Sequence, residues 1–539
     1  MGFRLRHIKF RGGKQMKLHR LYLESYQVLR NLEIDFSPRT ENFLTHPPSY
    51  SLDFLVGVNG TGKSTVLRVL FDLMRKLERH APIEYGFELE YELGETDTKR
   101  YIKLSNFPEE TEFADLDTEE ILPLGELKVW EDNTEVQLSR SVLPEIVVAF
   151  TTGSETAWKK LDEIQPLSGG YLDAIQELSL LDRAIGEIPG KPLRLDTLEN
   201  FQPEEESQFL FIEAHQLSLV TLCGLLADIA QNPENRRLEE VLQGTKKNTD
   251  KGANIKAIAG FSLKFRLTQG TTSQADRNEV ERLANFATRK LRLGSDYLLV
   301  FDLTTSGNST AQTIIQEFSS GLQLFRILCP LGKIGDDGQS VLREVNIFLE
   351  RSSSDSDDHE EQDDPPLLLL DWLSDGERSF LARMCLFTLL GETEALILLD
   401  EPEVHFNDFW KRKIVSLLDK TLEQRQSHVL ITTHSSITLT DVLEEDIVIL
   451  KRPASYTNNA KPPDLKTFAA DPSDIMVHVF NAPHPAGQRS VSYIQRILLE
   501  ATNGNLEERR QTLENLLLVV AQGYWSYKIR RELLEIEPE

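Results

Sequence analysis

The chain has 539 residues, of which 40% are hydrophobic and 27% are charged. This length and composition predict a globular protein with two or more domains and a large core. The 59 Lys and Arg residues against 86 Asp and Glu give a formal net charge of -27, which argues against a protein that coats nucleic acid indiscriminately, because phosphate binding needs a positive surface.

Cysteine spacing and hydropathy argue against further classes of protein. Cys223, Cys329 and Cys385 lie far apart in the sequence and form no C-x-x-C, so neither a disulfide framework nor a zinc site is predicted. No apolar run approaches the roughly 18 residues of a membrane helix. Residues 1–15 are basic and polar and lack the apolar middle of a signal peptide. We therefore expect a cytoplasmic protein with reduced thiols and no membrane partner, in which residues 1–15 are an upstream start or a flexible extension.

The first chemical motif follows a predicted pair of strands at 18–36. Residues 57–65 read G-V-N-G-T-G-K-S-T and fit G-x-x-x-x-G-K-[ST], between a strand-like run at 53–56 and a helix-like run at 66–70. A strand before and a helix after is the context in which this loop binds the phosphates of ATP, with Lys63 facing the β and γ oxygens and Ser64 ligating Mg²⁺. The residues expected to bind the nucleotide are Gly57, Asn59, Gly60, Gly62, Lys63, Ser64 and Thr65.

Over the next 280 or so residues the sequence pattern changes from strand-like to mixed and largely helical. Two runs, 85–91 and 99–104, resemble edge strands, and the continuous apolar run 145–150 predicts a buried parallel strand. Beyond them the pattern is mixed and largely helical, without a detectable repeat. In this part we expect helices at 213–231 and 278–293 and strands at 261–267 and 297–301.

A second chemical cluster follows an acidic stretch at 355–364, which we interpret as a disordered loop. Residues 373–378 read L-S-D-G-E-R and precede a helical pattern, and an apolar strand then ends in Asp400 and Glu401. Asp400 is expected to hold the Mg²⁺ shell, and Glu401 to polarise the attacking water. One more apolar run ends at His434, which is expected to meet the γ-phosphate.

In this order the motifs resemble those of ABC-type ATPases of the RecF and SMC branch. Residues 57–65 resemble Walker A, 373–377 the signature motif, 396–401 Walker B and 403–407 the D-loop, and His434 resembles the switch histidine. The roughly 26 residues between signature and Walker B leave room for one helix and one strand. A second match to the signature letters, at 167–171, is not followed by a Walker B at that distance, so we reject it.

The resemblance implies how the active unit is assembled. Ser374 and Gly376, with Glu377, would contact the γ-phosphate held by Lys63 of another subunit, so a homodimer or higher homo-oligomer is expected. Two departures stand out: the signature reads Ser-Asp-Gly-Glu rather than the commoner Ser-Gly-Gly-Gln, and no glutamine marks a Q-loop after 145–150.

The expected fold is therefore α/β: an ABC-type P-loop ATPase head with a large mixed, mostly helical insertion between Walker A and the signature. Frequent Gly and Pro in the insertion argue against a long coiled coil. The predicted parts are an N-terminal ATPase lobe at 1–155, the insertion at 156–345, a C-terminal ATPase lobe at 346–452, and a C-terminal region at 453–539 that is a candidate partner-docking segment.

A closer resemblance is to the ATPases of bacterial anti-phage and restriction-associated systems, specifically the Septu (PtuA-type) family and its retron-associated members. The matching segments are 16–36, 373–378, 399–405, 468–475 and the tail 522–531. The family implies a separately encoded HNH nuclease as partner. Tyr524, Trp525 and Tyr527 in the tail either pack on the ATPase core or bind that partner.

No nuclease site is visible in the chain itself. After His434 too little sequence remains for a Toprim domain, and the 11 histidines form no compact His-Asn-His set. Two function hypotheses remain: an ATP-hydrolysing antiviral defence regulator that controls a nuclease, or a RecF/SMC-like DNA-repair clamp without a toxic partner. DNA contact would need a local basic patch, for which 289–292 and 528–531 are the candidates. The altered signature also leaves open a scaffold that turns ATP over slowly.

Overall fold

The computed structural model divides the chain into two compact units, Met1–Ala469 and Ala470–Glu539, which are described separately. Both the acidic stretch 355–364 and the rejected signature match 167–171 lie outside the described residues. No helix in the described ranges is long and apolar enough to cross a membrane. The structure describes residues 14–36, 50–95, 98–108, 124–163, 208–231, 238, 255–268, 272–304, 308–333, 340–351, 367–390, 394–422, 427–451, 458–484, 486–502 and 505–536.

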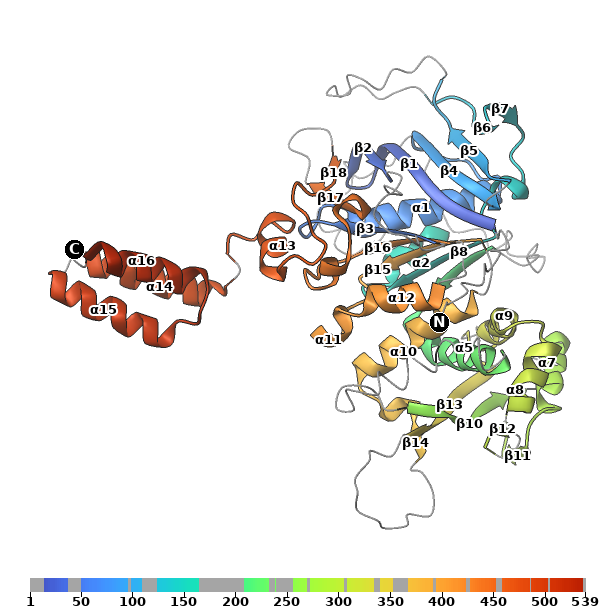
Figure 1. Cartoon of the computed structure of the whole chain (residues 1–539). Helices are drawn as coiled ribbons and strands as arrows, with labels where there is room; N and C mark the ends of the chain where they lie inside the picture. The colour runs from blue at the N-terminus through green and yellow to red at the C-terminus, as the bar shows by residue number, and fades with distance from the viewer. Residues whose placement is uncertain are drawn as a thin grey trace, which may run out of the picture. The chain divides into compact units, whose positions relative to one another are not determined.

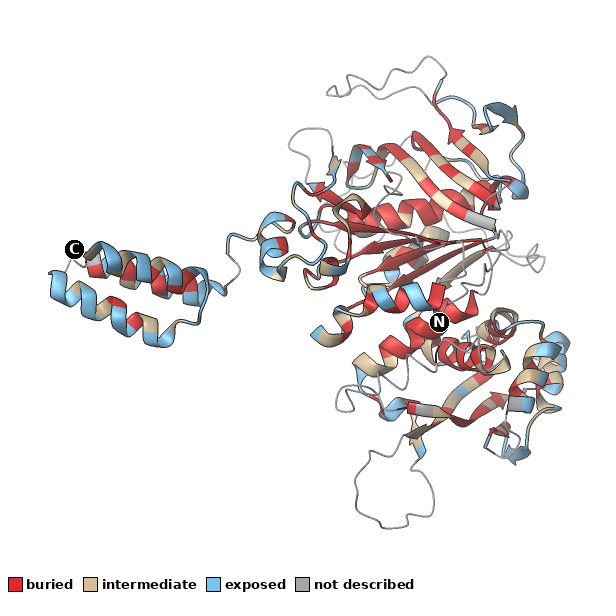
Figure 2. Cartoon of the chain, in the orientation of Figure 1, coloured by how far each residue is buried: buried red, intermediate tan, exposed pale blue. Residues whose placement is uncertain are grey.

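A seven-stranded sheet forms the centre of the first unit, in the order β18-β17-β3-β16-β15-β8-β9. All neighbours pair in parallel except β18, which is antiparallel to β17. Every residue of four of these strands is buried, as expected where helices or a second sheet cover both faces (Figure 2). The strands are β3 (Ser51–Val56), β8 (Ile146–Thr151), β9 (Phe209–Ile212), β15 (Ala395–Asp400), β16 (His428–Thr432), β17 (Ile447–Lys451) and β18 (Asn459–Lys461).

Helices cover this sheet on both sides (Figure 1). On one side α1 (Lys63–Glu78) packs between the central sheet and a second, six-stranded antiparallel sheet, and one apolar cluster joins all three layers. On the other side lie α10 (Asp375–Leu389), α11 (Asp408–Lys411) and α12 (Ile414–Leu422). The α/β fold class is therefore confirmed.

The six-stranded sheet has the order β2-β1-β4-β5-β6-β7. The expectation that 85–91 and 99–104 are edge strands is wrong, because β4 and β5 lie inside this sheet. A hairpin that closes through Asp132 and Asn133, both with positive φ, adds β6 and β7 beyond β5. The strands are β1 (Lys14–Tyr26), β2 (Leu29–Asp35), β4 (Phe87–Glu95), β5 (Arg100–Ser105), β6 (Lys128–Glu131) and β7 (Thr134–Val136).

Residues 156–369, which include the predicted insertion 156–345, contain helices and a five-stranded antiparallel sheet, here called the insertion sheet, of order β11-β12-β10-β13-β14. The predicted helix 278–293 is too long: α7 ends at Ala284, and 289–293 is the exposed strand β11, which turns into β12 at Gly294 with φ 65°. The elements are α2 (Thr156–Glu163), α5 (Leu217–Ala230), β10 (Ile255–Arg266), α7 (Gln274–Ala284), β11 (Arg289–Leu293), β12 (Asp296–Asp302), α8 (Asn308–Glu317), α9 (Gly321–Leu331), β13 (Leu342–Arg351) and β14 (Leu367–Leu369).

Helix α5 packs against α10 and against α8, α9 and β13. It is apolar on nearly all sides and packs against α10 so closely that a Cβ on Gly224 would lie 2.4 Å from the Cβ of Cys385. Cys223 on α5 is near enough to Cys385 and Cys329 for their charges to interact. Burial raises the pKa of all three thiols, so they are inert core groups.

The second unit contains α13 (Pro472–His478), α14 (Gln488–Thr502), α15 (Leu506–Val519) and α16 (Tyr524–Ile536). Trp525 and Ile529 of α16 pack with apolar residues of α14 and α15. Tyr524 and Tyr527 are 62% and 66% exposed. Trp525 therefore belongs to the core of its own unit, whereas packing on the ATPase core or partner binding by the two exposed tyrosines stays a prediction.

Candidate nucleotide site

The phosphate-loop segment runs from the end of β3 to the start of α1, as its sequence predicts. Gly57 and Gly62 have φ of 146° and 98°. A Cβ on Gly57 would lie 2.4 Å from the Leu450 carbonyl oxygen, and one on Gly62 would lie 2.5 Å from Cδ2 of Leu29. Of the amino acids, only glycine fits these backbone angles and short distances. The loop therefore turns tightly enough for successive backbone N–H groups to point toward one place.

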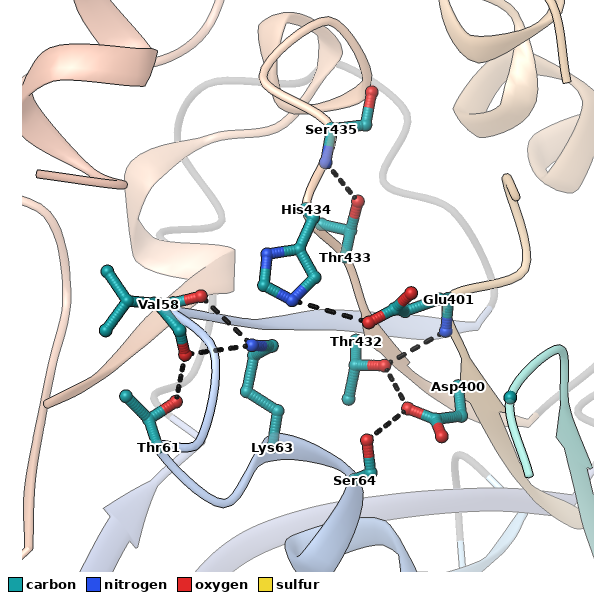
Figure 3. A network of polar contacts seen from close by, with 12 residues as sticks. Val58, Thr61, Lys63, Ser64, Asp400, Glu401, Thr432, Thr433, His434 and Ser435 are labelled. Atoms are coloured by element: carbon teal, nitrogen blue, oxygen red, sulfur yellow. Dashed lines mark hydrogen bonds and ion pairs between the residues drawn. The ribbon is translucent and has the colours of Figure 1, made fainter. Parts of the chain in front are cut away.

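Lys63 lies at the centre of the site (Figure 3). Its Nζ donates to the carbonyl oxygens of Gly57 at 3.0 Å and Val58 at 3.3 Å. Burial lowers the pKa of the ammonium, while the charges of Glu401 and Asp400 oppose that shift. The ammonium is held by carbonyl dipoles rather than neutralised by an ion pair, and its charge remains for an anionic ligand.

Asp400 binds three hydroxyl groups from three different strands or helices. Its Oδ1 accepts from Ser64 Oγ at 2.8 Å and from Thr432 Oγ1 at 2.7 Å, and its Oδ2 accepts from Thr151 Oγ1 at 3.0 Å. Thr151, Asp400 and Thr432 are paired in register at the carboxyl ends of β8, β15 and β16. Hard oxygen ligands on Ser64 and Asp400, beside a loop that fits phosphate, suit Mg²⁺.

Glu401 and His434 face each other above Asp400. The His434 Nε2 lies 3.3 Å from Glu401 Oε1, and the Glu401 N–H donates to Thr432 Oγ1 at 3.0 Å (Figure 3). Burial, followed by the charge of Asp400, raises the pKa of the Glu401 carboxyl. Burial, followed by Lys63, lowers the pKa of His434. A carboxylate of raised pKa beside a neutral imidazole is suited to accept a proton from water.

Glu403 anchors the strand end that carries His434. Its Oε1 accepts from the Thr433 hydroxyl and, at 3.3 Å, from the His434 N–H. Glu403 is 4% exposed, and burial raises its pKa. The D-loop-like segment is thereby tied to the switch-like histidine within one subunit.

Sequence reasoning missed Thr151 and Thr432 as site residues. The place where a Q-loop glutamine was sought holds Thr151 and Thr152 instead, and Thr152 Oγ1 donates to the Glu401 carbonyl at 3.0 Å. A signal was present, since three buried strands each end in an oxygen-bearing side chain: Thr151, Asp400 and Thr432. Parallel strands place such ends at one edge of the sheet.

The signature-like residues form a helix start of their own. Ser374 is the N-cap of α10 and shares a capping box with Glu377, with N–H donors at 2.9 and 3.3 Å. A Cβ on Gly376 would lie 2.6 Å from the His405 carbonyl oxygen. Within one chain these three residues make no hydrogen bond or ion pair to loop 57–65 in the part that the structure describes. The structure thus brings together Lys63, Ser64, Asp400, Glu401 and His434, but not Ser374, Gly376 or Glu377.

Part of the chain is similar to a known protein family. Residues 283–441 match a family described as "AAA domain, putative AbiEii toxin, Type IV TA system". That range holds the signature-like, Walker B-like and switch-like segments, so this part of the chain is similar to that AAA domain. No curated protein matches the chain.

Three solved structures of SMC head domains are similar to this chain, at low sequence identity and low TM-score. The SMC head domain from Thermotoga maritima is 11% identical, with a TM-score of 0.33 over 83% of this chain and 100% of that one. The SMC head from Pyrococcus furiosus bound to the C-terminal domain of ScpA is 11% identical, with a TM-score of 0.31 over 84% and 96% of the two chains. The SMC head from Pyrococcus yayanosii is 12% identical, with a TM-score of 0.31 over 84% and 98%.

Proposed function

We propose that this protein is the ATP-binding and ATP-hydrolysing regulatory subunit of a cytoplasmic anti-phage defence system, and that its ATP-dependent head dimerisation controls a separately encoded nuclease of the HNH type. The observation that carries the ATPase part is the convergence of Lys63, Ser64, Asp400, Glu401 and His434 at one sheet edge.

Each residue of that edge has a chemical task. Bound Mg²⁺-ATP supplies the phosphoryl group that is transferred to water. Lys63 would neutralise phosphate charge, and Ser64 and Asp400 would hold Mg²⁺ through oxygen. Glu401 would accept the proton of the attacking water, and His434, whose Nε2 lies 3.3 Å from Glu401 Oε1, would fix the orientation of that carboxylate.

Dimerisation is supported by the placement of the signature-like residues. Ser374 and Gly376 lie at the start of α10 and make no contact with the loop of their own chain in the described ranges, and Ser374 is exposed. A helix N-terminus of this kind is an anion site. A second copy that presents its loop there would complete one site from two chains.

The defence role rests on the matched family description, which names an AbiEii toxin of a toxin–antitoxin system. Exposed Tyr524 and Tyr527 on α16 offer a surface for the nuclease partner, since tyrosine is enriched at protein interfaces.

The test is a pull-down of the full chain from its native host, with and without ATP, followed by nuclease assay of the eluate. Recovery of a small nuclease in fixed ratio supports the proposal. A Lys63→Ala variant is the control, because loss of the ammonium should abolish nucleotide binding and any ATP dependence of the complex. Recovery of ATP-dependent DNA alone, without a protein partner, would contradict the proposal.

The alternative is a RecF/SMC-like DNA clamp, and one observation favours it. Strand β11 exposes Arg289, Lys290 and Arg292 at the edge of the insertion sheet, and within the described residues none of the three forms an ion pair with a carboxylate. Such a patch fits nucleic-acid phosphates. DNA binding that requires ATP and weakens steeply with salt would support the clamp.

A further inference from the structure

A cleft separate from the phosphate loop lies between the end of β8, the start of α5 and the first turns of α10. Its volume is about 530 Å³, within the range of about 300 to 1,000 Å³ that small-molecule sites occupy. The polar lining includes Thr152, His215, Arg378, Ser379, Arg383 and His405. Thr151 lines the cleft as well and donates to Asp400, and Thr152 bonds to the Glu401 backbone, so the cleft borders the group around Lys63.

Arg383 is the unusual group of this cleft. Its side chain is 2% exposed, and its guanidinium carbon lies 4.9 and 5.0 Å from the ring centres of Phe150 and Phe406. One terminal nitrogen donates to Ser379 Oγ, while Nε has no hydrogen-bond partner among the described residues. The carboxylate of Glu403 favours the charged form of Arg383, but no ion pair joins these two side chains in the described part of the chain.

The surroundings of the Arg383 side chain favour a bound anion. Burial lowers the pKa of Arg383 to about 9, still above neutral pH, so the cation is retained. A buried charge without a bonded counterion is costly, and an oxyanion that supplied acceptors would offset that cost.

The rest of the lining is compatible with an anion. Arg378 lies five residues before Arg383 on α10, and both residues line the cleft. Two acids also line it, and both are engaged: Asp375 pairs with Arg378 at 2.8 Å, and Glu155 accepts from the Ala214 N–H at 2.5 Å.

We propose that this cleft binds the phosphoryl group of a small phosphorylated metabolite through Arg378 and Arg383. The cleft contains no residue of the phosphate loop, and it borders the ATP site at the Thr151–Thr152 turn, whose hydroxyls bond to Asp400 and to the Glu401 backbone.

The test uses the full chain with Lys63→Ala, in which the phosphate loop is disabled, and inorganic pyrophosphate as the probe in isothermal titration calorimetry. We expect saturable binding at millimolar or lower concentration. Adding Arg378→Gln should weaken it roughly ten-fold or more, the usual worth of a hydrogen bond to a charged group. Arg383→Met should weaken it further.

The matched control is Arg282→Gln in the same Lys63→Ala background. Arg282 and Arg378 side chains are both 39% exposed, and each pairs with a carboxylate three residues earlier. Loss of binding with Arg378→Gln but not with Arg282→Gln supports the proposal. If Arg383→Met does not fold, Ser379→Ala replaces it. Absence of saturable binding to the folded Lys63→Ala protein, or equal affinity in the two glutamine variants, would overturn it. Neither outcome bears on ATP hydrolysis by the unmodified chain, which is measured separately.

Discussion

Adjacent acids at the end of β15 have opposite surroundings, and this difference assigns their roles. Asp400 is 6% exposed and accepts three hydroxyl hydrogen bonds, which hold its oxygens in place. The Glu401 side chain is 36% exposed and faces His434. A fixed acid suits a metal, and a reachable acid of raised pKa suits proton transfer.

Replacement of Glu401 by Gln tests the assignment of the proton acceptor. The amide keeps the size of the side chain but cannot take a proton from water, so hydrolysis should fall by about 10²- to 10⁴-fold. ATP affinity should be retained, because Lys63 and the loop are untouched. Phosphate release and nucleotide binding measure the two effects, with Glu344→Gln on the insertion sheet as a control. Persistent turnover in Glu401→Gln would remove Glu401 from the mechanism.

The pH dependence of hydrolysis should report the same carboxyl. Burial and Asp400 raise the pKa of Glu401, so the folded protein binds this proton more tightly than the unfolded chain does. The group therefore favours folding most at acidic pH, and that contribution falls as pH rises from its ordinary pKa through the raised one. Activity moves in the opposite sense and should rise through that window as Glu401 ionises. A rate profile that stays flat as pH rises above the ordinary carboxyl pKa would contradict this expectation.

Thr432 is expected to serve both stability and activity. Its hydroxyl donates to Asp400 and accepts from the Glu401 N–H, so Thr432→Val should cost about 1 to 3 kcal/mol of unfolding free energy and lower the ATPase rate. Thr421→Val is the matched control, since Thr421 is also 0% exposed and its hydroxyl donates to the Leu417 carbonyl oxygen on α12. Urea unfolding should show similar losses for both variants, and only Thr432→Val should lose activity. Equal activity in the two would show that Thr432 is purely structural.

At the scale of elements, the sequence pattern correctly predicted the helices and strands whose signals lie within one segment. The strand before the loop, α1, α10 and the strands ending at Asp400 and Thr432 were all predicted, because their apolar runs and caps lie within one segment. The interior position of β4 and β5 was not, because strand order depends on which distant segments pair. The end of α7 was missed because its amphipathic pattern continues into β11, where the Gly294 turn decides the pairing.

The approach of α10 to the turn after β15 can be tested at Gly376. An added methyl group would lie 2.6 Å from the His405 carbonyl oxygen, which is backbone and cannot rotate away. Gly376→Ala should therefore destabilise the protein by about 1 to 3 kcal/mol and reduce ATP turnover. Gly332→Ala provides the comparison, because its methyl group would meet Cys329 O at an ordinary 3.4 Å. Thermal unfolding that shows no difference between these variants would contradict the close packing seen here.

For the whole molecule, the central question is how a single set of motifs makes a working site. The loop, Asp400, Glu401 and His434 are joined within one chain, whereas Ser374 and Gly376 stand at a separate helix start. Oligomers that close by twofold symmetry present the same surface twice. Two copies placed loop to helix would give two composite sites, each with residues from both chains.

Mixing two inactive variants tests this composite site. Lys63→Ala breaks the loop of its own chain, and Ser374→Arg breaks the helix start of its own chain, so neither homodimer has an intact site. In a heterodimer the intact loop of one subunit faces the intact helix of the other, and an equal mixture should recover about one quarter of the normal rate. Ser320→Arg removes a comparable N-cap from α9 and should stay active alone, which separates the signature role from loss of a helix cap. If the mixture is as inactive as its components while gel filtration shows that subunits exchange, Ser374 does not act across the dimer, and the site must be complete within one chain.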